Sequence, residues 1–327
     1  MLIRFLLLSV LSLSLTSCQS TSEKFEAKEF IATSQDNFIS KNEKPELIWS
    51  KGIFTEGPTV GPDGTVYFTD IPASRIMKNS KKGINIFRQD SGKANGLAFN
   101  TKKEMLICEG GNRQVTKLSL QGEYTVLASN YKGKKFNSPN DIVSASNGDI
   151  YFTDPRYGNR DNMELDYEGV FLIRNGELKL ATKSLNRPNG ILISIDGKSA
   201  YVADNNPDAP RTLSKFKIEA DGSFSQKEIL FKFQGKSRGI DGMDIDTEGN
   251  LYATAGSGDE SGIYVFSPSG ENLAMIPLPD KPTNCCFGIG KESNILYVTC
   301  QVNRQPHKNK QFGLFKIKLN KNGYKLK

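Results

Sequence analysis

One pattern of polar and apolar residues recurs six times along the chain. Each copy begins with a carboxylate or amide residue, runs through a short apolar stretch, breaks at a Gly, Asp or Asn turn, and resumes as an aromatic, β-rich run. The copies are EGPTVGPDGTVYFTD from Glu56, NGLAFNTKKEMLICE from Asn95, NDIVSASNGDIYFTD from Asn140, NGILISIDGKSAYVAD from Asn189, DGMDIDTEGNLYATA from Asp241 and NCCFGIGKESNILYVT from Asn284. Turn pairs such as Asp63-Gly64 tolerate positive φ, so each copy predicts a β-hairpin.

The spacing of the copies indicates the architecture. Their first residues are 39, 45, 49, 52 and 43 positions apart, close to the ~40–50 residues of a four-stranded propeller blade. Further short strands are expected between the copies, as at 169–174 and 262–266, and no stretch has a sustained helical period. We therefore predict an all-β fold, a six-bladed β-propeller with four-stranded blades over residues 46–327. A β-sandwich with fortuitous spacing is the alternative.

The six first residues of the copies are candidates for one site. In a propeller, the same position of every blade lies at the same distance from the axis, so these residues are expected to surround a central channel. All six carry a carboxylate or an amide. Such oxygen ligands suit a hard divalent cation, so the pattern predicts a metal-binding channel. Calcium is the first choice, with zinc, magnesium or manganese as alternatives. The competing interpretation is that Asn and Asp only cap the loops that enter the inner strands.

Several short blocks carry a resemblance to a known family. These blocks are EGP at Glu56, NSPND from Asn137, FTDPRYG from Phe152, RPNG from Arg187, DGM at Asp241 and PTNCCFG from Pro282. Together they resemble the bacterial gluconolactonase branch of the regucalcin, or senescence marker protein, family, over essentially the whole predicted propeller. The resemblance implies six blades, a divalent metal in the channel and hydrolysis of a sugar lactone.

The resemblance also assigns roles to residues. It places metal ligands on Glu56, Asn189 and Asp241, and it places the family's channel asparagine, beside metal or substrate, on Asn140. The chain departs from the bacterial branch in blade 2, where Cys108-Glu109 is followed by Gly110 and Gly111 in place of a histidine. A substrate contact from that histidine is therefore absent.

The remaining residues restrict the chemistry. The only histidine is His307, in a Lys- and Asn-rich segment, which argues against a Ser-His-Asp triad and a multi-histidine zinc site. Metal-assisted lactone hydrolysis remains, in which the cation polarises the carbonyl and a carboxylate takes the proton of the attacking water. Asp241 is the candidate base, because the resemblance places it on the metal and an aspartate there could reach a bound water. Asp154 and Asp204 are alternatives that could instead bind a second metal, cap a turn or orient a ligand.

Substrate-binding candidates are Asn95 and Asn140 in the channel, and Arg156 and Tyr157 in a loop expected to lie over it. For Arg156 and Tyr157, loop packing is the alternative. There are two competing functions. One is a related esterase or phosphotriesterase, and the other is a non-catalytic metal-stabilised scaffold.

The N-terminus predicts export. Arg4 precedes an apolar run over residues 5–15, shorter than the ~20 residues of a membrane-spanning helix. Residues 1–17 therefore read as a signal peptide, and Leu15-Thr16-Ser17-Cys18 resembles a bacterial lipobox with Cys18 as the lipidated residue. We expect a flexible linker over 18–45 and a lipoprotein anchored to the cell envelope, on the periplasmic face of the outer membrane or at the cell surface. The alternative is an ordinary secretory signal with a chance cysteine.

Charge and cysteines change this picture little. The formal net charge is +7, but the lysines are scattered without interleaved aromatics, so no nucleic-acid partner is predicted. The chain retains four further cysteines, Cys108, Cys285, Cys286 and Cys300. Buried thiols are favoured, although a disulfide from Cys300 to one of its two neighbours in the last repeat is the alternative.

Overall fold

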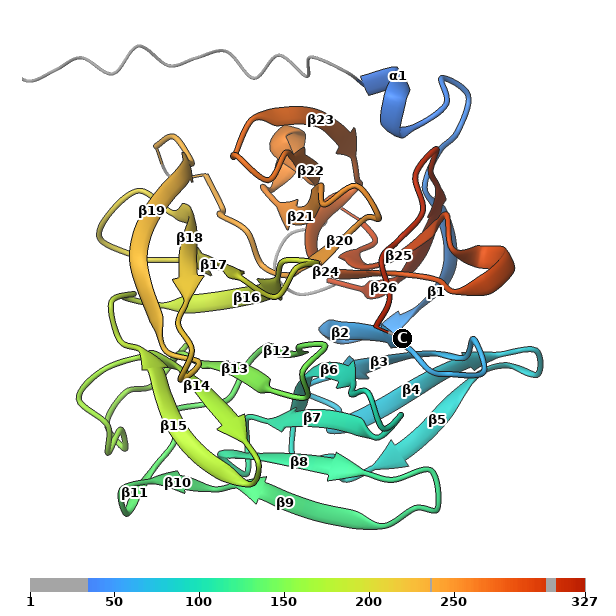
Figure 1. Ribbon diagram of the computed structural model, residues 1–327. Coiled ribbons are helices and arrows are strands. Elements are labelled where there is room, and N and C mark those ends of the chain that lie inside the picture. The colour runs from blue at the N-terminus through green and yellow to red at the C-terminus, as the bar shows by residue number, and fades with distance from the viewer. Residues whose placement is uncertain (1–34, 236, 304–309, 327) are drawn as a thin grey trace, which may run out of the picture.

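The structure, a computed structural model, describes residues 35–235, 237–303 and 310–326. Six four-stranded antiparallel sheets surround one axis (Figure 1), which confirms the predicted all-β, six-bladed propeller. The predicted signal peptide, the lipidation residue Cys18 and His307 lie outside the described residues, so export and lipidation stay predictions.

The first three blades follow one another along the chain, each built from the innermost strand outward. Blade 1 contains β2 (Thr55–Val60), β3 (Val66–Asp70), β4 (Arg75–Ser80) and β5 (Gly83–Gln89). Blade 2 contains β6 (Ala94–Phe99), β7 (Met105–Glu109), β8 (Gln114–Leu118) and β9 (Tyr124–Ala128). Blade 3 contains β12 (Ile142–Ser144), β13 (Ile150–Asp154), β14 (Gly169–Arg174) and β15 (Glu177–Thr182). A small hairpin, β10 (Asn130–Tyr131) and β11 (Lys134–Lys135), joins blades 2 and 3.

The next two blades repeat this arrangement, and the last one is assembled from both ends of the chain. Blade 4 contains β16 (Pro188–Ile193), β17 (Ser199–Asp204), β18 (Thr212–Ile218) and β19 (Phe224–Lys232). Blade 5 contains β20 (Met243–Ile245), β21 (Leu251–Ala255), β22 (Gly262–Phe266) and β23 (Asn272–Pro277). Blade 6 contains β24 (Asp280–Phe287), β25 (Ile295–Gln301), β26 (Phe312–Lys318) and β1 (Glu46–Gly52). Two short 3₁₀ helices, η1 (Gly258–Glu260) and η2 (Gly290–Glu292), interrupt loops of blades 5 and 6.

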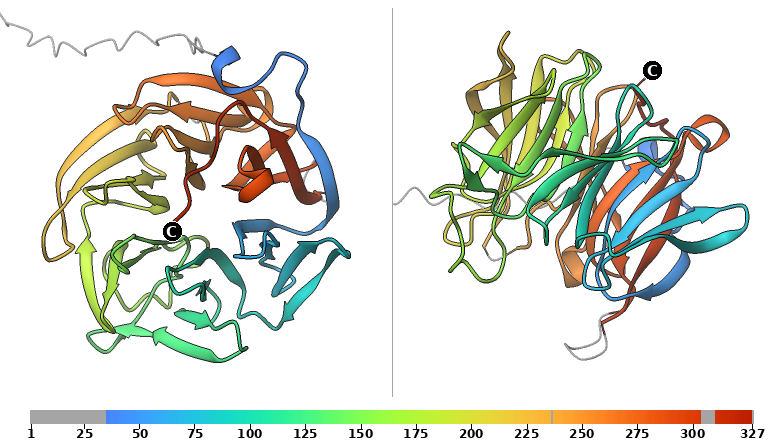
Figure 2. Two further views of the ribbon diagram at one scale, coloured as in Figure 1. Left: turned by 45° about the vertical axis from the view of Figure 1, so that its right-hand side comes forward. Right: turned by 90° about the horizontal axis from the view of Figure 1, so that it is seen from below.

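The ring closes between β1 and β26. The N-terminal strand pairs antiparallel with the last strand of the chain, with Glu46 opposite Lys316 and Gly52 opposite Phe312. In Figure 2, left, the blue β1 lies on the outside of blade 6 beside the red strands. One blade thus contains strands from both ends of the chain, so the ring has no open edge at this junction.

The six repeated sequence blocks form the two inner strands of each blade, as predicted. The turn glycines between them adopt positive φ, for example 85° at Gly64 and 88° at Gly148. The preceding side chain caps the turn, since Asp63 Oδ1 accepts the N–H of Thr65 at 3.0 Å. Turn chemistry therefore fixes where each inner hairpin reverses.

The core lies between neighbouring blades. Every residue of β7, β13, β21 and β22 is buried, since each sheet is covered on both faces by adjacent sheets. Between blades 2 and 3, the rings of Phe136, Phe152 and Phe171 pack with centroids 5.1–5.5 Å apart. The four described cysteines are buried free thiols, as favoured from the sequence.

The segment before β1 differs from the prediction of a linker that extends to residue 45. The helix α1 (Gln35–Phe38) packs against β23, and Phe38 and Ile39 are buried in the core of blades 5 and 6. The backbone N–H of Asn320 donates to the carbonyl oxygen of Phe38 at 2.9 Å. The apolar Phe38-Ile39 pair explains why this part of the segment docks onto the propeller. No helix among the described residues has the length and apolar character to cross a bilayer.

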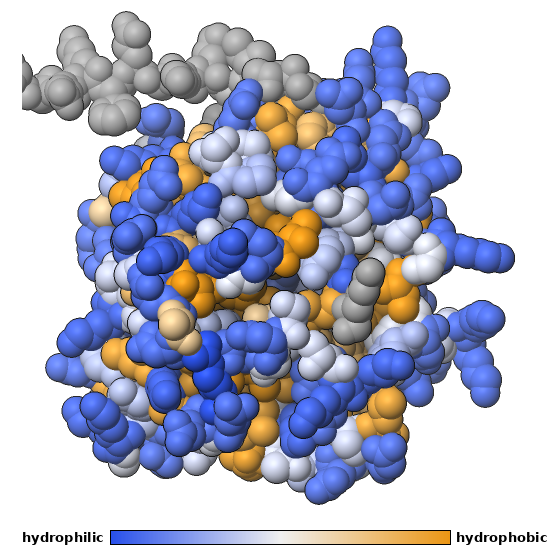
Figure 3. Space-filling view, viewed as in Figure 1, coloured by the Kyte–Doolittle hydropathy of each residue, from blue (hydrophilic) through white to orange (hydrophobic). Residues whose placement is uncertain are grey.

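The C-terminal segment, as far as Leu326, runs to the propeller axis. After β26, Gly323 bridges Asp246, and the N–H of Tyr324 donates to the carbonyl oxygen of Ile245 at 2.9 Å. The ammonium of Lys325 lies 3.2 Å from a carboxylate oxygen of Asp244. Figure 2, left, shows this red segment running to the middle of the ring. Figure 3 shows patches of apolar side chains among the mostly polar ones in the view of Figure 1.

Candidate active site

The inner strands bring five of the six repeated polar residues to one cavity. Each inner strand begins at this end of the channel, and the cavity measures about 940 Å³. The repeated residues that line it are Glu56, Asn95, Asn140, Asn189 and Asp241. The sixth, Asn284, lines a different cavity and accepts the N–H of Cys285 through Oδ1. Five of the six repeated positions thus lie at one cavity, and the sixth does not.

In most blades a small residue follows the repeated polar residue. Backbone contacts between blades explain why this residue is small. The N–H of Gly96 donates to the carbonyl oxygen of Asn140 in the next blade, and the N–H of Gly190 donates to that of Asp241, both at 2.7 Å. A Cβ at Gly190 would lie 2.4 Å from the carbonyl oxygen of Asp241. The glycine allows neighbouring inner strands to approach closely, which brings the polar side chains together.

Two carboxylates of the cavity have raised pKa values. Burial raises the pKa of Glu56 well above its usual range, and the negative charge of Asp241 raises it further. Burial also raises the pKa of Asp241, against the opposing effect of Arg238 and of the hydrogen bond from Asn189. Two buried acids in one place favour a cation between them.

Hydrogen bonds orient Asp241. The Nδ2 of Asn189 donates to Asp241 Oδ1 at 2.6 Å and to the Tyr157 hydroxyl at 3.0 Å. The Nη2 of Arg238 pairs with Asp241 Oδ2. The side-chain oxygen of Asn189 makes no hydrogen bond within the described residues, so it remains available to a ligand.

The chemistry of this donor set fits a hard cation. Glu56 and Asp241 provide carboxylate oxygens, and Asn140 and Asn189 provide amide oxygens, which are the ligand types that calcium and magnesium accept. No three His, Cys, Asp or Glu side chains within the described ranges form a metal-binding group on their own. A site here therefore depends on the amides as well as on the two acids.

Sequence reasoning missed Asp141. Burial raises its pKa to about 7, with a smaller contribution from the charge of Asp241, and its Oδ2 accepts the N–H of Ile191 at 3.1 Å. The signal was present in the repeats, because the other five copies have a glycine or a cysteine at this position: Gly57, Gly96, Gly190, Gly242 and Cys285. Asp141 therefore places an additional buried carboxyl beside the site, at a position where the other copies have a small residue.

Asp154 and Asp204 have the capping role that was one of their predicted alternatives. Asp154 accepts the N–H groups of Asn137 and Ser138, each at 2.7 Å. Asp204 accepts those of Asn186 and Arg187. Neither carboxylate lines the cavity. Each one holds the loop that leads into the inner strand of its own blade.

The loop after β13 forms part of the cavity wall. Arg156 donates to the carbonyl oxygens of Asn137 and Asn159 at 2.6 and 2.8 Å, and its Nη2 pairs with Asn162 Oδ1. These bonds leave two of its five N–H groups for a ligand. Direct substrate contact by Arg156 and Tyr157 stays a prediction, and both residues line the cavity.

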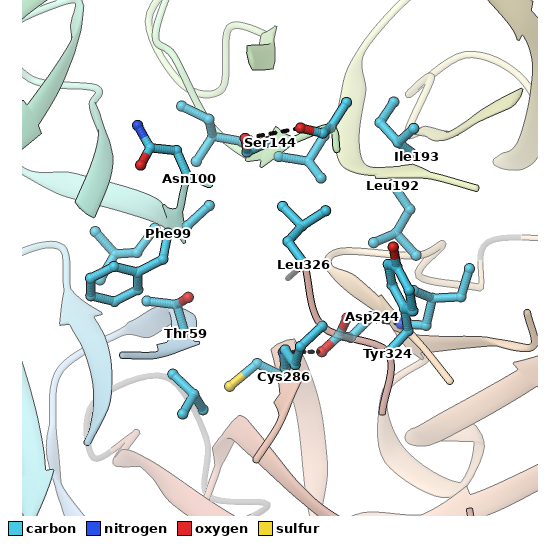
Figure 4. A pocket seen from close by; sticks show the side chains of 18 of the residues that line it. Thr59, Phe99, Asn100, Ser144, Leu192, Ile193, Asp244, Cys286, Tyr324 and Leu326 are labelled. Atoms are coloured by element: carbon cyan, nitrogen blue, oxygen red, sulfur yellow. Dashed lines mark hydrogen bonds and ion pairs between the residues drawn. The ribbon is translucent and has the colours of Figure 1, made fainter. Parts of the chain in front are cut away.

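A second cavity of about 450 Å³ lies at the other end of the inner strands. Its lining is largely apolar and includes Phe99, Leu192, Ile193 and Cys286. In Figure 4, Leu326 from the C-terminal segment lies among these side chains. The polar cavity and this apolar one thus occupy opposite ends of the channel.

The fold and the site define a class of protein, a six-bladed propeller with an acid-and-amide site at one end of its channel. The family model described as "SMP-30/Gluconolactonase/LRE-like region" matches residues 54–301, and the chain belongs to this family. This confirms the resemblance seen in the sequence.

Named relatives agree with this assignment. The chain is 33% identical to gluconolactonase of Zymomonas mobilis over 298 residues, which cover 82% of each chain. It is 33% identical to regucalcin of Oryctolagus cuniculus over 139 residues, 39% of this chain and 44% of the relative. The solved structure of a gluconolactonase from Xanthomonas campestris superimposes with a TM-score of 0.74 at 25% identity, covering 85% of this chain and 90% of that one.

Proposed function

We propose that this protein is a metal-dependent lactonase that opens a sugar lactone. The observation that carries the proposal is the convergence of Glu56, Asn140, Asn189 and Asp241 on one cavity. The similarity to gluconolactonase over 82% of the chain supports the reaction type.

The four residues would hold the divalent metal, with calcium as first choice because all of the ligands are oxygens. Such an ion, when bound, polarises an ester carbonyl and lowers the pKa of a bound water. Asp241 accepts the proton of the attacking water. Arg238 and Asn189 each hold one of its carboxylate oxygens, which limits the orientations of this base. The Tyr157 hydroxyl and the Asn95 amide line the same cavity and are candidate partners for sugar hydroxyls.

The test is hydrolysis of glucono-δ-lactone, followed by proton release and corrected for the spontaneous reaction. Activity should disappear on chelation and return with one of calcium, magnesium, manganese or zinc. Asp241→Asn should lower kcat by about 10²–10⁴-fold, the usual contribution of a general base. Asp196→Asn, which removes a carboxylate from an exposed turn of blade 4, should retain wild-type turnover.

Other outcomes would contradict the proposal. Tight metal binding without turnover of any lactone would favour a related esterase or phosphotriesterase. No metal binding at all would favour a non-catalytic scaffold. Wild-type rates in Asp241→Asn would exclude Asp241 as the base.

A further inference from the structure

The polar cavity is lined by more positive charge than its metal site explains. Six cationic side chains face two carboxylates, Glu56 and Asp241. The six cations are Lys93, Arg113, Arg156, Arg187, Arg211 and Arg238. The apolar cavity at the other end has two lysines and two aspartates, so the excess belongs to the polar end. A divalent ion on the two carboxylates would increase this excess.

Some of these charges have partners within the fold. Arg238 pairs with Asp241. Arg113 lies 3.6 Å from a carboxylate oxygen of Glu164 and donates to the carbonyl oxygen of Phe136. Arg156 holds its own loop through three acceptors. These arginines stabilise the walls of the cavity and also contribute positive potential.

Arg187 is different, because its guanidinium makes no hydrogen bond within the described residues. Its Nε is buried without a partner. The guanidinium stacks over the ring of Tyr157, with its carbon 5.4 Å from the ring centroid. The nearest carboxylate oxygen is Glu168 Oε2, 3.7 Å from Nε.

The carboxylate of Glu168 already has other partners. Its Oε2 accepts the N–H of Arg156 at 2.7 Å, and its Oε1 pairs with Arg160 at 2.7 Å. The Glu168 carboxylate therefore neutralises the positive charge of Arg187 only in part. On the blade 2 side, Lys93 is exposed, and its ammonium forms no ion pair within the described residues. A buried donor without an acceptor, such as the Nε of Arg187, is unfavourable unless a ligand satisfies it.

We propose that the substrate carries an anionic group, a carboxylate or a phosphate, in addition to the lactone, and that Arg187 is the residue that contacts this group. This inference rests on the proposed lactonase function and narrows its substrate class. A planar guanidinium fixed on an aromatic ring can bind either anion through two parallel hydrogen bonds. The other cations of the cavity raise the local concentration of anionic substrates.

Two sets of measurements test the proposal. Hydrolysis compares glucono-δ-lactone with a lactone of glucaric acid, which retains a carboxylate, and with 6-phosphogluconolactone. Binding to the metal-loaded protein, measured by calorimetry, compares glucose with glucuronate and glucose 6-phosphate and does not depend on turnover. We expect one charged member of each set to be favoured at least about tenfold over the neutral one, as for one charge-assisted hydrogen bond, and the preference to weaken with salt.

Variants connect the preference to Arg187. Arg187→Gln should reduce the charged-to-neutral ratio about tenfold, and Arg187→Lys should restore part of it. Lys82→Gln, at an exposed turn of blade 1, removes the same charge far from the cavity and should leave the ratio unchanged. Equal use of neutral and charged lactones, or an unchanged ratio in Arg187→Gln, would overturn the inference. Preferential binding of charged sugars without hydrolysis of any lactone would support it and reject the lactonase function instead.

Discussion

At the residue scale, the most unusual groups are carboxyls buried inside the propeller. Asp154 ends the second strand of blade 3, and burial raises its pKa to about 7 although two backbone N–H groups donate to it. The unfolded chain would titrate this residue near 3.9. The folded protein therefore binds more protons than the unfolded one between these values, so its stability falls as the pH rises through this window.

Asp154→Asn tests this dependence. When the pH is raised from 5 to 8, ionisation of the Asp154 carboxyl should lower the free energy of unfolding of the wild type by roughly 2–3 kcal/mol. The variant should be less stable at pH 5 because a cap is weakened, but it should lose less stability on going to pH 8. Urea denaturation at both pH values measures the difference. Asp166→Asn, at an exposed position, should follow the wild-type pH dependence. Parallel curves for Asp154→Asn and wild type would contradict the assignment.

The sequence predicted the side chains that point into the cavity better than those that support it. Glu56, Asn140, Asn189 and Asp241 were found because a repeat places equivalent positions at one radius. Arg187 and Arg238 lie just outside the repeated blocks. Their roles depend on contacts with other blades, as between Arg238 and the carbonyl oxygen of Pro282, which no local pattern encodes.

At the scale of elements, the inner strands combine structure and chemistry. The strand that carries Asn189 also bonds to the backbone of Asp241 through the next residue, Gly190. Close packing of the strands is therefore what sets the separation of the two side chains. The hairpins and turns could be predicted from the sequence, because apolar runs are separated by turn-forming residues. The bond between blades could not, because it depends on tertiary packing.

Gly190→Ala should separate these strands. The added Cβ would lie 2.4 Å from the carbonyl oxygen of Asp241, so blade 5 must shift, at about 1–3 kcal/mol of stability. Because Asp241 moves with that backbone, we expect lactone turnover to fall at least about tenfold at a temperature where the variant is folded. Gly148→Ala, which has φ of 88° and no heavy atom near its added Cβ, should cost about 1–2 kcal/mol and leave turnover intact. Equal turnover in the two variants would argue against the coupling.

At the scale of the whole molecule, the chain closes its ring by non-covalent contacts between its two ends. Trp49 of β1 packs edge-on against Phe68 of blade 1, with ring centroids 5.3 Å apart, and Arg75 lies over its indole. Ile48 and Trp49 join a cluster that includes Phe68 and Met77 of blade 1 and Tyr297 and Leu314 of blade 6. The sequence placed the start of the propeller at residue 46, but not the pairing of this strand with the last one, because that contact joins residues about 270 positions apart.

Trp49→Ala should weaken this junction. Trp49 is half-buried, so its loss should lower the free energy of unfolding by about 2–3 kcal/mol, somewhat less than for a fully buried aromatic residue. Leu47→Ala removes an apolar side chain that is 42% exposed on the same strand and should change stability by no more than about 0.5 kcal/mol. Thermal unfolding of both variants, followed by circular dichroism, measures the difference. Because the junction lies at the outer part of blades 6 and 1, the folded Trp49→Ala protein should retain the catalytic rate of the wild type. An equal loss of stability in the two variants would mean that the β1–β26 pairing, and not the packing of Trp49 on blade 1, closes the ring.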